Sequence, residues 1–300
     1  MKVIRLGLII SPEVMPLDDG SNINGPCCIK VPSWCKNKLG NFYLYFAHHR
    51  GKYIRMAYSD SLSGPWIEYM GGVLNIDELI DAHHHIASPD VFIDHQRKEL
   101  RMYFHSPSFE KKEQWTFLAK SNNGLDYSQY GSSPLAPFYL RILNYNNRFY
   151  GMSKGGNIWF SDSGLDHFTS LHNPFDRTLD NEIWHNSEGS VRHVALYRRN
   201  KTLYIFFTRI GDSPEKILCG TINISVPQED WKVSNIVTVA KPKMQYEGVN
   251  IKVKPSKAGA SDSEENGLRD PFIFEDKNKL YMFYCVKGEF GIALSELKLT

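Results

Sequence analysis

The chain has 300 residues, which is enough for one large domain or two modest ones with a well-buried core. Its 35 Lys and Arg against 33 Asp and Glu give a net charge of +2, and no basic run stands out. This balance does not supply the phosphate-tracking surface of a nucleic-acid-binding protein, so we expect no nucleic-acid partner. Aromatic residues form 13% of the chain, which favours β-strands.

The first segment, KVIRLGLII at 2–10, predicts a strand rather than a signal peptide, because Arg5 interrupts the apolar run and no small-residue cleavage site follows. No stretch approaches the roughly 18 to 20 apolar residues that cross a bilayer, so we expect no membrane partner. The cysteines are odd in number and lack a C-x-x-C spacing, which predicts reduced thiols in a cytoplasmic protein and neither a disulfide framework nor a zinc site.

Five segments repeat one pattern: a short strand, a polar turn and an aromatic-rich second strand. In chain order they are NGPCCIKVPSWCKNKLGNFYLYF (24–46), HIASPDVFIDHQRKELRMYF (85–104), PFYLRILNYNNRFYGM (137–152), HVALYRRNKTLYIFF (193–207) and GLRDPFIFEDKNKLYMFY (267–284). Counted back 14 residues from the end of the second strand, three segments reach Asp90, His193 and Asp270. We therefore predict that these three residues occupy equivalent places.

A third strand follows each pair, as in YIRMAYSDS and GIALSEL, so each unit is an antiparallel meander. Five such units, with almost no 3.6-residue period, predict an all-β fold that is a five-bladed β-propeller with mostly four-stranded blades. We expect a single domain over 1–300, with blades at approximately 24–70, 86–131, 136–172, 190–240 and 268–300. Segment 2–10 would supply the missing outer strand of the last blade. A two-sheet sandwich is the disfavoured alternative, and a short helix near 75–82 would decorate a loop.

The starts of first strands and the ends of second strands share one mouth of a propeller, because antiparallel neighbours meet there. The residues at the strand starts are Asn24, Asp90, His193 and Asp270, with Tyr139 uncertain. The residues at the ends of the second strands are one of His48 and His49, then His105, Lys154 and Arg209. The loops add Trp184, His185, Glu188, Arg192, Asp212, Glu215, Tyr246, Glu247 and Arg269. Polar groups of both signs in one concavity are typical of an active site. The alternative for either Asp is a capping role on backbone N–H groups. For His83 to His85 we expect a solvated loop.

Several motifs resemble a known family. ASPDVF, SDSLSGPW and RDPFIFEDKNKLYMFY are similar to the five-bladed propellers of glycoside hydrolase family 43, and nearest to uncharacterised bacterial members of that superfamily that share NGP, FAHH, SPDV, RH and LRDP. In family 43 a first-blade Asp is the general base, a second-blade Asp tunes it and a third-blade Glu is the acid. The resemblance gives Asp90 the second role. Asn24-Gly25-Pro26 stands where the base Asp is expected, and the third blade lacks the Glu.

We therefore expect a glycosidase that uses carboxylate and His general acid–base catalysis in the axial pocket. Asp270 or Asp90 would be the base, with the other modulating it. His193 or Glu247 would be the acid, and Glu188 is a further candidate; a related agarooligosaccharide-cleaving family, which places a His at the acid position, supports His193.

The remaining candidates would bind an acidic or substituted sugar through Arg192, Arg209 and Arg269, stack on it through Trp184 and Tyr246, and line the pocket through Asn24, His48, His105 and Asp212. No cofactor is expected, although the central channel leaves room for a structural or water-bridged cation. The alternatives are a non-catalytic carbohydrate-binding propeller, which the missing first-blade Asp favours, and a structural or interaction propeller.

Overall fold

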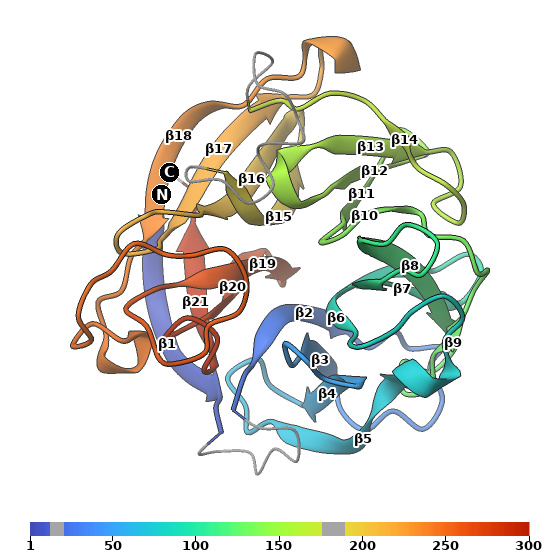
Figure 1. Ribbon diagram of the computed structural model, residues 1–300, viewed down its shortest axis with the longest axis horizontal. Coiled ribbons are helices and arrows are strands. Elements are labelled where there is room, and N and C mark those ends of the chain that lie inside the picture. The colour runs from blue at the N-terminus through green and yellow to red at the C-terminus, as the bar shows by residue number, and fades with distance from the viewer. Residues whose placement is uncertain (13–20, 176–189, 300) are drawn as a thin grey trace.

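The computed structural model describes residues 1–12, 21–175 and 190–299. Five antiparallel sheets surround a central axis, and the inner strand of each sheet faces that axis (Figure 1). The predicted five-bladed β-propeller is confirmed. Within the described residues, no helix is long and apolar enough to cross a membrane.

The blades follow chain order, and their strands run from the inner to the outer edge in the following sequence. Blade one is β2 (Asn24–Lys30), β3 (Phe42–Ala47), β4 (Tyr53–Ser59) and β5 (Ile67–Asn75); blade two is β6 (Ala87–Asp94), β7 (Glu99–Pro107), β8 (Gln114–Ser121) and β10 (Ala136–Pro137), with β9 (Ser128–Gln129) also on β8; blade three is β11 (Arg141–Tyr145), β12 (Arg148–Met152), β13 (Ile158–Ser161) and β14 (Thr169–Ser170); blade four is β15 (Val191–Arg199), β16 (Thr202–Arg209), β17 (Ile217–Asn223) and β18 (Ser234–Ala240); blade five is β19 (Arg269–Asp276), β20 (Lys279–Cys285), β21 (Ile292–Lys298) and β1 (Lys2–Ile10).

Helical structure in the described residues is limited to four short 3-10 turns in loops: η1 (Ile76–Glu78), η2 (Lys154–Gly156), η3 (Gln228–Asp230) and η4 (Gln245–Glu247). The first falls inside the segment 75–82, where the sequence predicts a helix, but it spans three residues.

The N-terminal strand closes the ring, as predicted. β1 pairs antiparallel with β21 from Lys2 opposite Lys298 to Ile10 opposite Ile292, and the two termini lie close together at the outer edge of this blade (Figure 1). Closure in this way leaves the outer edge of β21 paired rather than open to another chain. It also makes the first and last segments of the sequence depend on each other.

Aromatic side chains fill the spaces between blades, which accounts for their abundance. Phe42 packs edge-on against Phe274 between blades one and five, and Phe92 packs against Phe149 between blades two and three. Such pairs stabilise the interface beyond the area they bury, by roughly 0.5–1.5 kcal/mol each.

The inner strands of four blades begin with a β-bulge, in which two residues face one residue of the second strand. The bulge residues are Gly25-Pro26, Ser88-Pro89, Arg192-His193 and Asp270-Pro271. In three of these bulges the first residue has a positive φ, 60° at Gly25, 47° at Ser88 and 46° at Asp270. A bulge redirects a side chain at the rim of a sheet, and these bulges do so at the end of the axis that carries the polar residues.

The predicted equivalence of Asp90, His193 and Asp270 is wrong by one or two residues. Asp270 is the first residue of its bulge and His193 the second, whereas Asp90 is the residue after its bulge. The cause is turn length: four residues, 95–98, join the first two strands of blade two, but two residues, 277–278, join those of blade five. Equal intervals in the sequence therefore conceal a shift along the inner strand, and Asp90 lies deeper in its blade than Asp270.

Candidate active site

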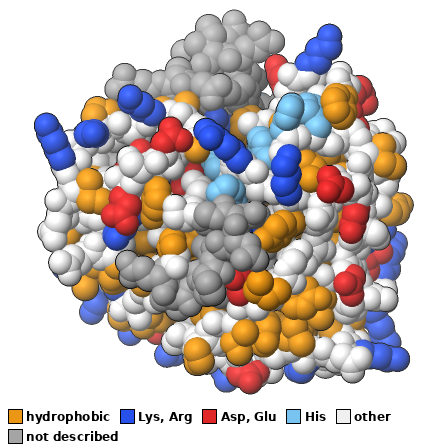
Figure 2. Space-filling view, turned by 60° about the horizontal axis from the view of Figure 1, so that its bottom comes forward, with side chains coloured by type: hydrophobic (Ala, Val, Ile, Leu, Met, Phe, Trp, Pro, Cys, Tyr) orange, Lys and Arg blue, Asp and Glu red, His pale blue; other side chains and the backbone are white. Residues whose placement is uncertain are grey.

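Six side chains follow one another around one end of the axis, and all five blades contribute to the series. We call this set the axial ring: His49, His85, His105, Tyr139, His193 and Asp270. Its ring centroids follow one another at 6.3, 6.2, 4.5 and 4.1 Å from His49 to His193. His193 then pairs with Asp270, which accepts a hydrogen bond from the N–H of Gly25 in blade one. In Figure 2 histidine side chains gather on one face beside Lys and Arg side chains.

Asp270 and His193 are the most constrained pair of the axial ring. One carboxylate oxygen of Asp270 contacts Nδ1 of His193, and the other accepts the N–H of Gly25 at 2.9 Å. Burial alone would raise the pKa of Asp270, but the His193 ring and the Gly25 N–H outweigh burial and hold that pKa well below its usual range. Burial lowers the pKa of His193 despite the carboxylate. The imidazole is therefore neutral near pH 7 and donates its Nδ1 proton to Asp270.

This orientation leaves Nε2 of His193 with its lone pair. Nε2 is buried and has no hydrogen-bond partner among the described residues. The same holds for Oδ1 of Asn24 and Nδ1 of His105, which belong to the same end of the axis. Buried polar atoms normally have a partner, so three such atoms at one end of the axis indicate a place for water or a ligand.

A second imidazole–carboxylate pair lies beside the first. Nδ1 of His49 is 3.2 Å from Oε2 of Glu289, and Asn22 donates to the same oxygen at 2.7 Å. Burial would raise the pKa of Glu289, but the hydrogen bond with His49 and the charges of His49 and Arg269 together outweigh burial, and the pKa is lowered. Arg269, the residue before Asp270, donates to the other oxygen of Glu289 at 3.3 Å. The side chain of His49 is 25% exposed, so this pair is the more accessible of the two.

The two histidines between these pairs are neutral. Burial lowers the pKa of His85 to about 4, with His49 adding to the effect. Burial also lowers the pKa of His105 well below its usual value. No three His, Cys, Asp or Glu side chains in the described part of the chain are grouped so as to hold a metal ion, and all five cysteines are buried and free.

Two of the predicted sugar-binding arginines are already engaged in buried ion pairs. Both contact Glu215: Nε of Arg192 lies 3.0 Å and Nε of Arg269 lies 2.7 Å from its carboxylate oxygens. Arg269 also contacts Glu265 at 2.7 Å. With 3% and 1% exposure of their side chains, these arginines brace the loops behind the axial ring rather than present charge to a sugar.

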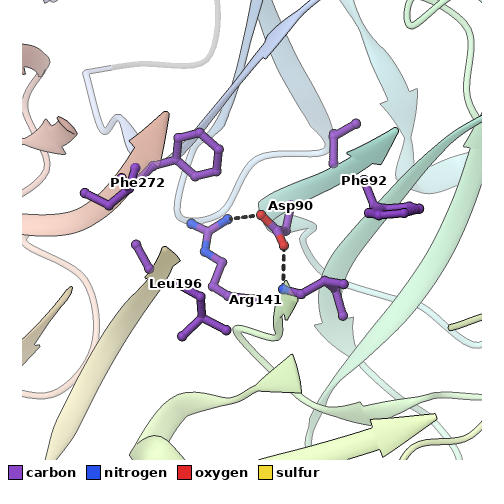
Figure 3. A pocket seen from close by; sticks show the side chains of 9 residues that line it. Asp90, Phe92, Arg141, Leu196 and Phe272 are labelled. Carbon is purple, nitrogen blue, oxygen red and sulfur yellow. Dashed lines mark hydrogen bonds and ion pairs between the residues drawn. The ribbon is translucent and has the colours of Figure 1, made fainter. Parts of the chain in front are cut away.

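Asp90 lies in a separate small cavity on the axis, of about 170 Å³. Its carboxylate contacts Nη1 of Arg141 at 3.4 Å and accepts the N–H of Ile142 at 2.8 Å (Figure 3). The rest of the lining is apolar and includes Phe92 and Phe272. Burial raises the pKa of Asp90, although Arg141 opposes this shift. Asp90 is therefore a buried partner of Arg141 below the axial ring, not a member of it.

Glu247 and Tyr246 lie away from the axial ring. The Glu247 carboxylate accepts hydrogen bonds from Arg5 of β1 at 2.7 Å, from the Tyr284 hydroxyl at 2.8 Å and from the N–H groups of Lys243 and Met244. These contacts engage both carboxylate oxygens of Glu247 and help to hold β1 in blade five. The structure therefore places Glu247, one of the two predicted acids, away from the axial ring that contains His193.

The other predicted residues are distributed as follows. Asn24 and His105 are at the axial ring, but His49 rather than His48 contacts Glu289. Arg209 lies 5.5 Å over the Phe207 ring, and Asp212 pairs with Lys216 at 3.0 Å. Trp184, His185 and Glu188 fall outside the described residues.

Sequence reasoning missed Glu289 and His85. Glu289 lies in the turn between β20 and β21, within KGEFG, where nothing in the repeat distinguishes it from an ordinary loop charge. The sequence predicts a solvated loop for His85, yet this residue lies between His49 and His105. A signal existed in the second case, because His85 comes two residues before the inner strand of blade two.

Comparisons with known proteins agree with this architecture. No protein-family model matches the chain. A curated relative, "Uncharacterized protein R118" of Acanthamoeba polyphaga mimivirus, is 35% identical over 312 residues, which cover 94% of this chain and 85% of that protein. The chain belongs to the family of R118. The propeller is therefore the fold of this family.

Solved structures show the same fold at low sequence identity. The family 43 β-xylosidase/α-arabinofuranosidase CoXyl43 from a compost microbial metagenome superposes with a TM-score of 0.64, at 12% identity, over 97% of this chain and 96% of that chain. A putative glycosidase of Bacteroides thetaiotaomicron gives 0.67, at 11% identity, over 98% and 96%. The Xanthomonas citri GH43_1 enzyme, solved with xylose, gives 0.64, at 10% identity, over 98% and 91%. This chain thus has the propeller fold of these family 43 structures.

Proposed function

We propose that this protein cleaves a glycosidic bond at the axial ring, with two imidazole–carboxylate pairs as its proton-transfer groups. The observation that carries the proposal is the pairing of His193 with Asp270 beside the pairing of His49 with Glu289. The glycosidase fold of the solved neighbours supports the same interpretation. Glycoside cleavage needs one group that protonates the leaving oxygen and another that activates water.

His193 suits the role of base. It is neutral near pH 7, Asp270 fixes its orientation, and its Nε2 has no partner among the described residues. It would take a proton from water as the water oxygen forms a bond to the anomeric carbon. Asp270 remains ionised throughout and stabilises the imidazolium that results.

His49 suits the role of acid. Glu289 holds its Nδ1, so Nε2 faces away from the carboxylate and can deliver a proton to the departing glycosidic oxygen as the carbon–oxygen bond breaks. The pKa of Glu289 is lowered, so its carboxylate stays ionised beside this imidazole. The balance is complete: water supplies its hydroxyl to the sugar and its proton to His193, and His49 supplies the proton of the leaving hydroxyl.

The test is a screen of aryl glycosides and oligosaccharides with the wild type, His193→Gln and His49→Gln. A matched control is His95→Gln, because His95 is an exposed residue in the turn between β6 and β7. We expect each of the first two substitutions to lower kcat by roughly 10²–10⁴-fold, the usual contribution of one acid or base, and the control to leave it unchanged. Wild-type turnover in His193→Gln would refute the assignment.

The alternative is a non-catalytic carbohydrate-binding propeller. Asn24 favours it, because an amide stands where the family places its base and cannot accept a proton. Equilibrium binding distinguishes the two: saccharides that bind the wild type with micromolar affinity but are never hydrolysed would support the alternative.

A further inference from the structure

A larger cavity lies beside the axial ring, with a volume of about 780 Å³. Ile210 and Gly211 at the end of β16 form one wall, and residues between Ile251 and Asn266 form the other. Small-molecule sites commonly have volumes of about 300–1,000 Å³, so this cavity has room for one or two sugar units.

The loop that lines this cavity is held firmly. The N–H of Gly211 donates to the carbonyl of Ser256 at 3.0 Å, and the N–H of Ser256 donates to the carbonyl of Asp212 at 3.0 Å. The amide of Asn266 donates to the carbonyl of Ile251 at 2.9 Å. These hydrogen bonds therefore hold the loop that lines the cavity in place.

Arg192 connects the cavity to the catalytic pair. Its guanidinium donates to the carbonyls of Lys257 and of Gly259, the latter at 2.9 Å. Arg192 is also the residue immediately before His193 and belongs to the same bulge. The loop that lines this cavity is thus tied through Arg192 to the strand that carries the proposed base.

The acidic and basic residues that line the cavity differ in how they are paired. Each carboxylate in the lining has a cationic partner: Glu215 pairs with Arg192 and Arg269, Glu265 with Arg269, Glu264 with Lys287 at 2.8 Å, and Asp262 with Arg50 at 3.8 Å. In contrast Lys252, Lys254 and Lys257 are exposed and have no ion pair within the described ranges. Arg269 is shared by Glu215, Glu265 and Glu289. The three lysines are therefore the charged residues of the lining that have no ion-pair partner among the described residues.

We propose that this cavity binds an anionic group of a saccharide, a carboxylate or an ester sulfate or phosphate, and that it makes the substrate of the axial ring an acidic oligosaccharide. That the ligand is a sugar rests on the proposed function; that it is anionic rests on the three lysines. Lysine is suited to this task because its ammonium is a point charge with three donors that adapts to differently shaped anions. Arg192 and Arg269 are already in ion pairs, and they contribute by holding the loop around the cavity in place.

The test is calorimetric binding of three probes, trigalacturonate, lactose sulfate and neutral maltotriose, to the catalytically impaired His193→Gln protein. We expect one of the anionic probes to bind at least tenfold more tightly than maltotriose, and the identity of that probe distinguishes carboxylate from sulfate ester. A triple Lys252→Gln, Lys254→Gln, Lys257→Gln variant should weaken that binding on the order of tenfold or more, since the three ammonium groups that would pair with the anion are removed.

The matched control is the triple Lys36→Gln, Lys38→Gln, Lys277→Gln variant, which changes the net charge equally at exposed positions outside this cavity. It should retain the affinity, and both variants should unfold like the wild type in urea. Binding that the two triple variants weaken equally, or an equal affinity for all three probes, would overturn the proposal. Anion binding without hydrolysis would leave the cavity assignment standing and reject the glycosidase; hydrolysis of neutral sugars without anion binding would do the reverse.

Discussion

Asp270 and His193 come from adjacent blades, and the carboxylate that holds Nδ1 of His193 also accepts the N–H of Gly25 from a third blade. Three of the five inner strands therefore meet at one side chain. Because both oxygens of Asp270 are engaged, this residue can orient the imidazole but is not free to attack a substrate. In the proposed reaction Asp270 is therefore a positioning residue, and His193 is the group that exchanges protons.

Asp270→Asn should lower kcat by roughly 10²–10⁴-fold with little change in KM, because the neutral amide no longer stabilises the imidazolium. It should also move the pH profile. The carboxylate opposes the lowering of the His193 pKa, so its removal lowers that pKa further and shifts the acidic limb of kcat to lower pH. The pH–rate profile of the variant checks this, with Asp60→Asn at an exposed turn as the control. An acidic limb at the wild-type pH would contradict the role.

The neutral histidines should make the fold sensitive to acid. The pKa of His85 is about 4 in the folded protein, below its usual value of about 6.5, so between these values the unfolded chain takes up a proton that the folded chain does not. The free energy of unfolding should therefore fall as the pH drops from about 6.5 to 4, with His85 contributing on the order of 2 kcal/mol. Urea unfolding of the wild type and of His85→Gln at pH 7.5 and 4.5 measures this. An equal loss of stability in both proteins would rule it out, and exposed His95→Gln is the control.

Gly25→Ala should damage the site through the backbone. A Cβ at this position would lie 2.8 Å from Cα of Ser88, and the φ of 60° is one that glycine adopts most easily. We expect the substitution to lower the free energy of unfolding by more than about 2 kcal/mol and to displace the N–H that holds Asp270, because the left-handed conformation alone costs about 1–2 kcal/mol. Gly131→Ala, at a φ of 72° with no atom within 4 Å, isolates that backbone cost. Thermal and urea unfolding of the two variants should differ clearly; equal losses would contradict the proposed clash.

The propeller was predictable because its signal is repeated five times. Strand patterns and turns at regular spacing predicted the units, and the incomplete last unit left a place that segment 2–10 could fill, which β1 does. The site was less predictable because it depends on bulges and turn lengths. A two-residue difference between the turns at 95–98 and 277–278 moves Asp90 off the level of Asp270, and an interval counted along the chain cannot detect that.

The role of the remaining charged residues was also hidden from the sequence. Arg269 and Glu289 are 20 residues apart and look like independent loop charges, but the fold buries them in one ion pair at 3.3 Å. A charged residue near a pocket can bind a ligand or another part of the protein, and composition does not separate these cases. Which partner such a charged residue contacts depends on which loops the blades bring together.

Glu247→Gln should weaken the closure of the propeller. Its carboxylate, which is fully buried, joins Arg5 of the N-terminal strand to Tyr284 of β20. We expect a loss of about 2–4 kcal/mol in the free energy of unfolding, since removal of one partner leaves the other charge without compensation. A double-mutant cycle with Arg5→Met should show coupling, and kcat of the folded enzyme should remain at the wild-type level. A loss of kcat at unchanged stability would instead return Glu247 to the active site.

Arg141→Leu should make stability fall with rising pH. Arg141 neutralises Asp90 in a cavity whose other lining residues are apolar. Burial already raises the pKa of Asp90, and loss of Arg141 would raise it further, because this guanidinium is the largest influence that lowers it. A carboxyl group with a raised pKa in the folded state favours unfolding once the pH exceeds its unfolded value of about 3.9. The variant should therefore be less stable at pH 8 than at pH 5.

The double variant Asp90→Leu, Arg141→Leu isolates the pair. Removing both charges leaves no buried ion, so the stability lost in the single variant, about 3–5 kcal/mol near neutral pH, should be largely restored. Urea unfolding of the wild type and both variants at pH 5 and 8 provides the comparison. A double variant as unstable and as pH-dependent as Arg141→Leu would show that Asp90 is not the group responsible. The expected restoration would establish Asp90 and Arg141 as a mutually dependent pair on the axis, beneath the residues proposed to transfer protons.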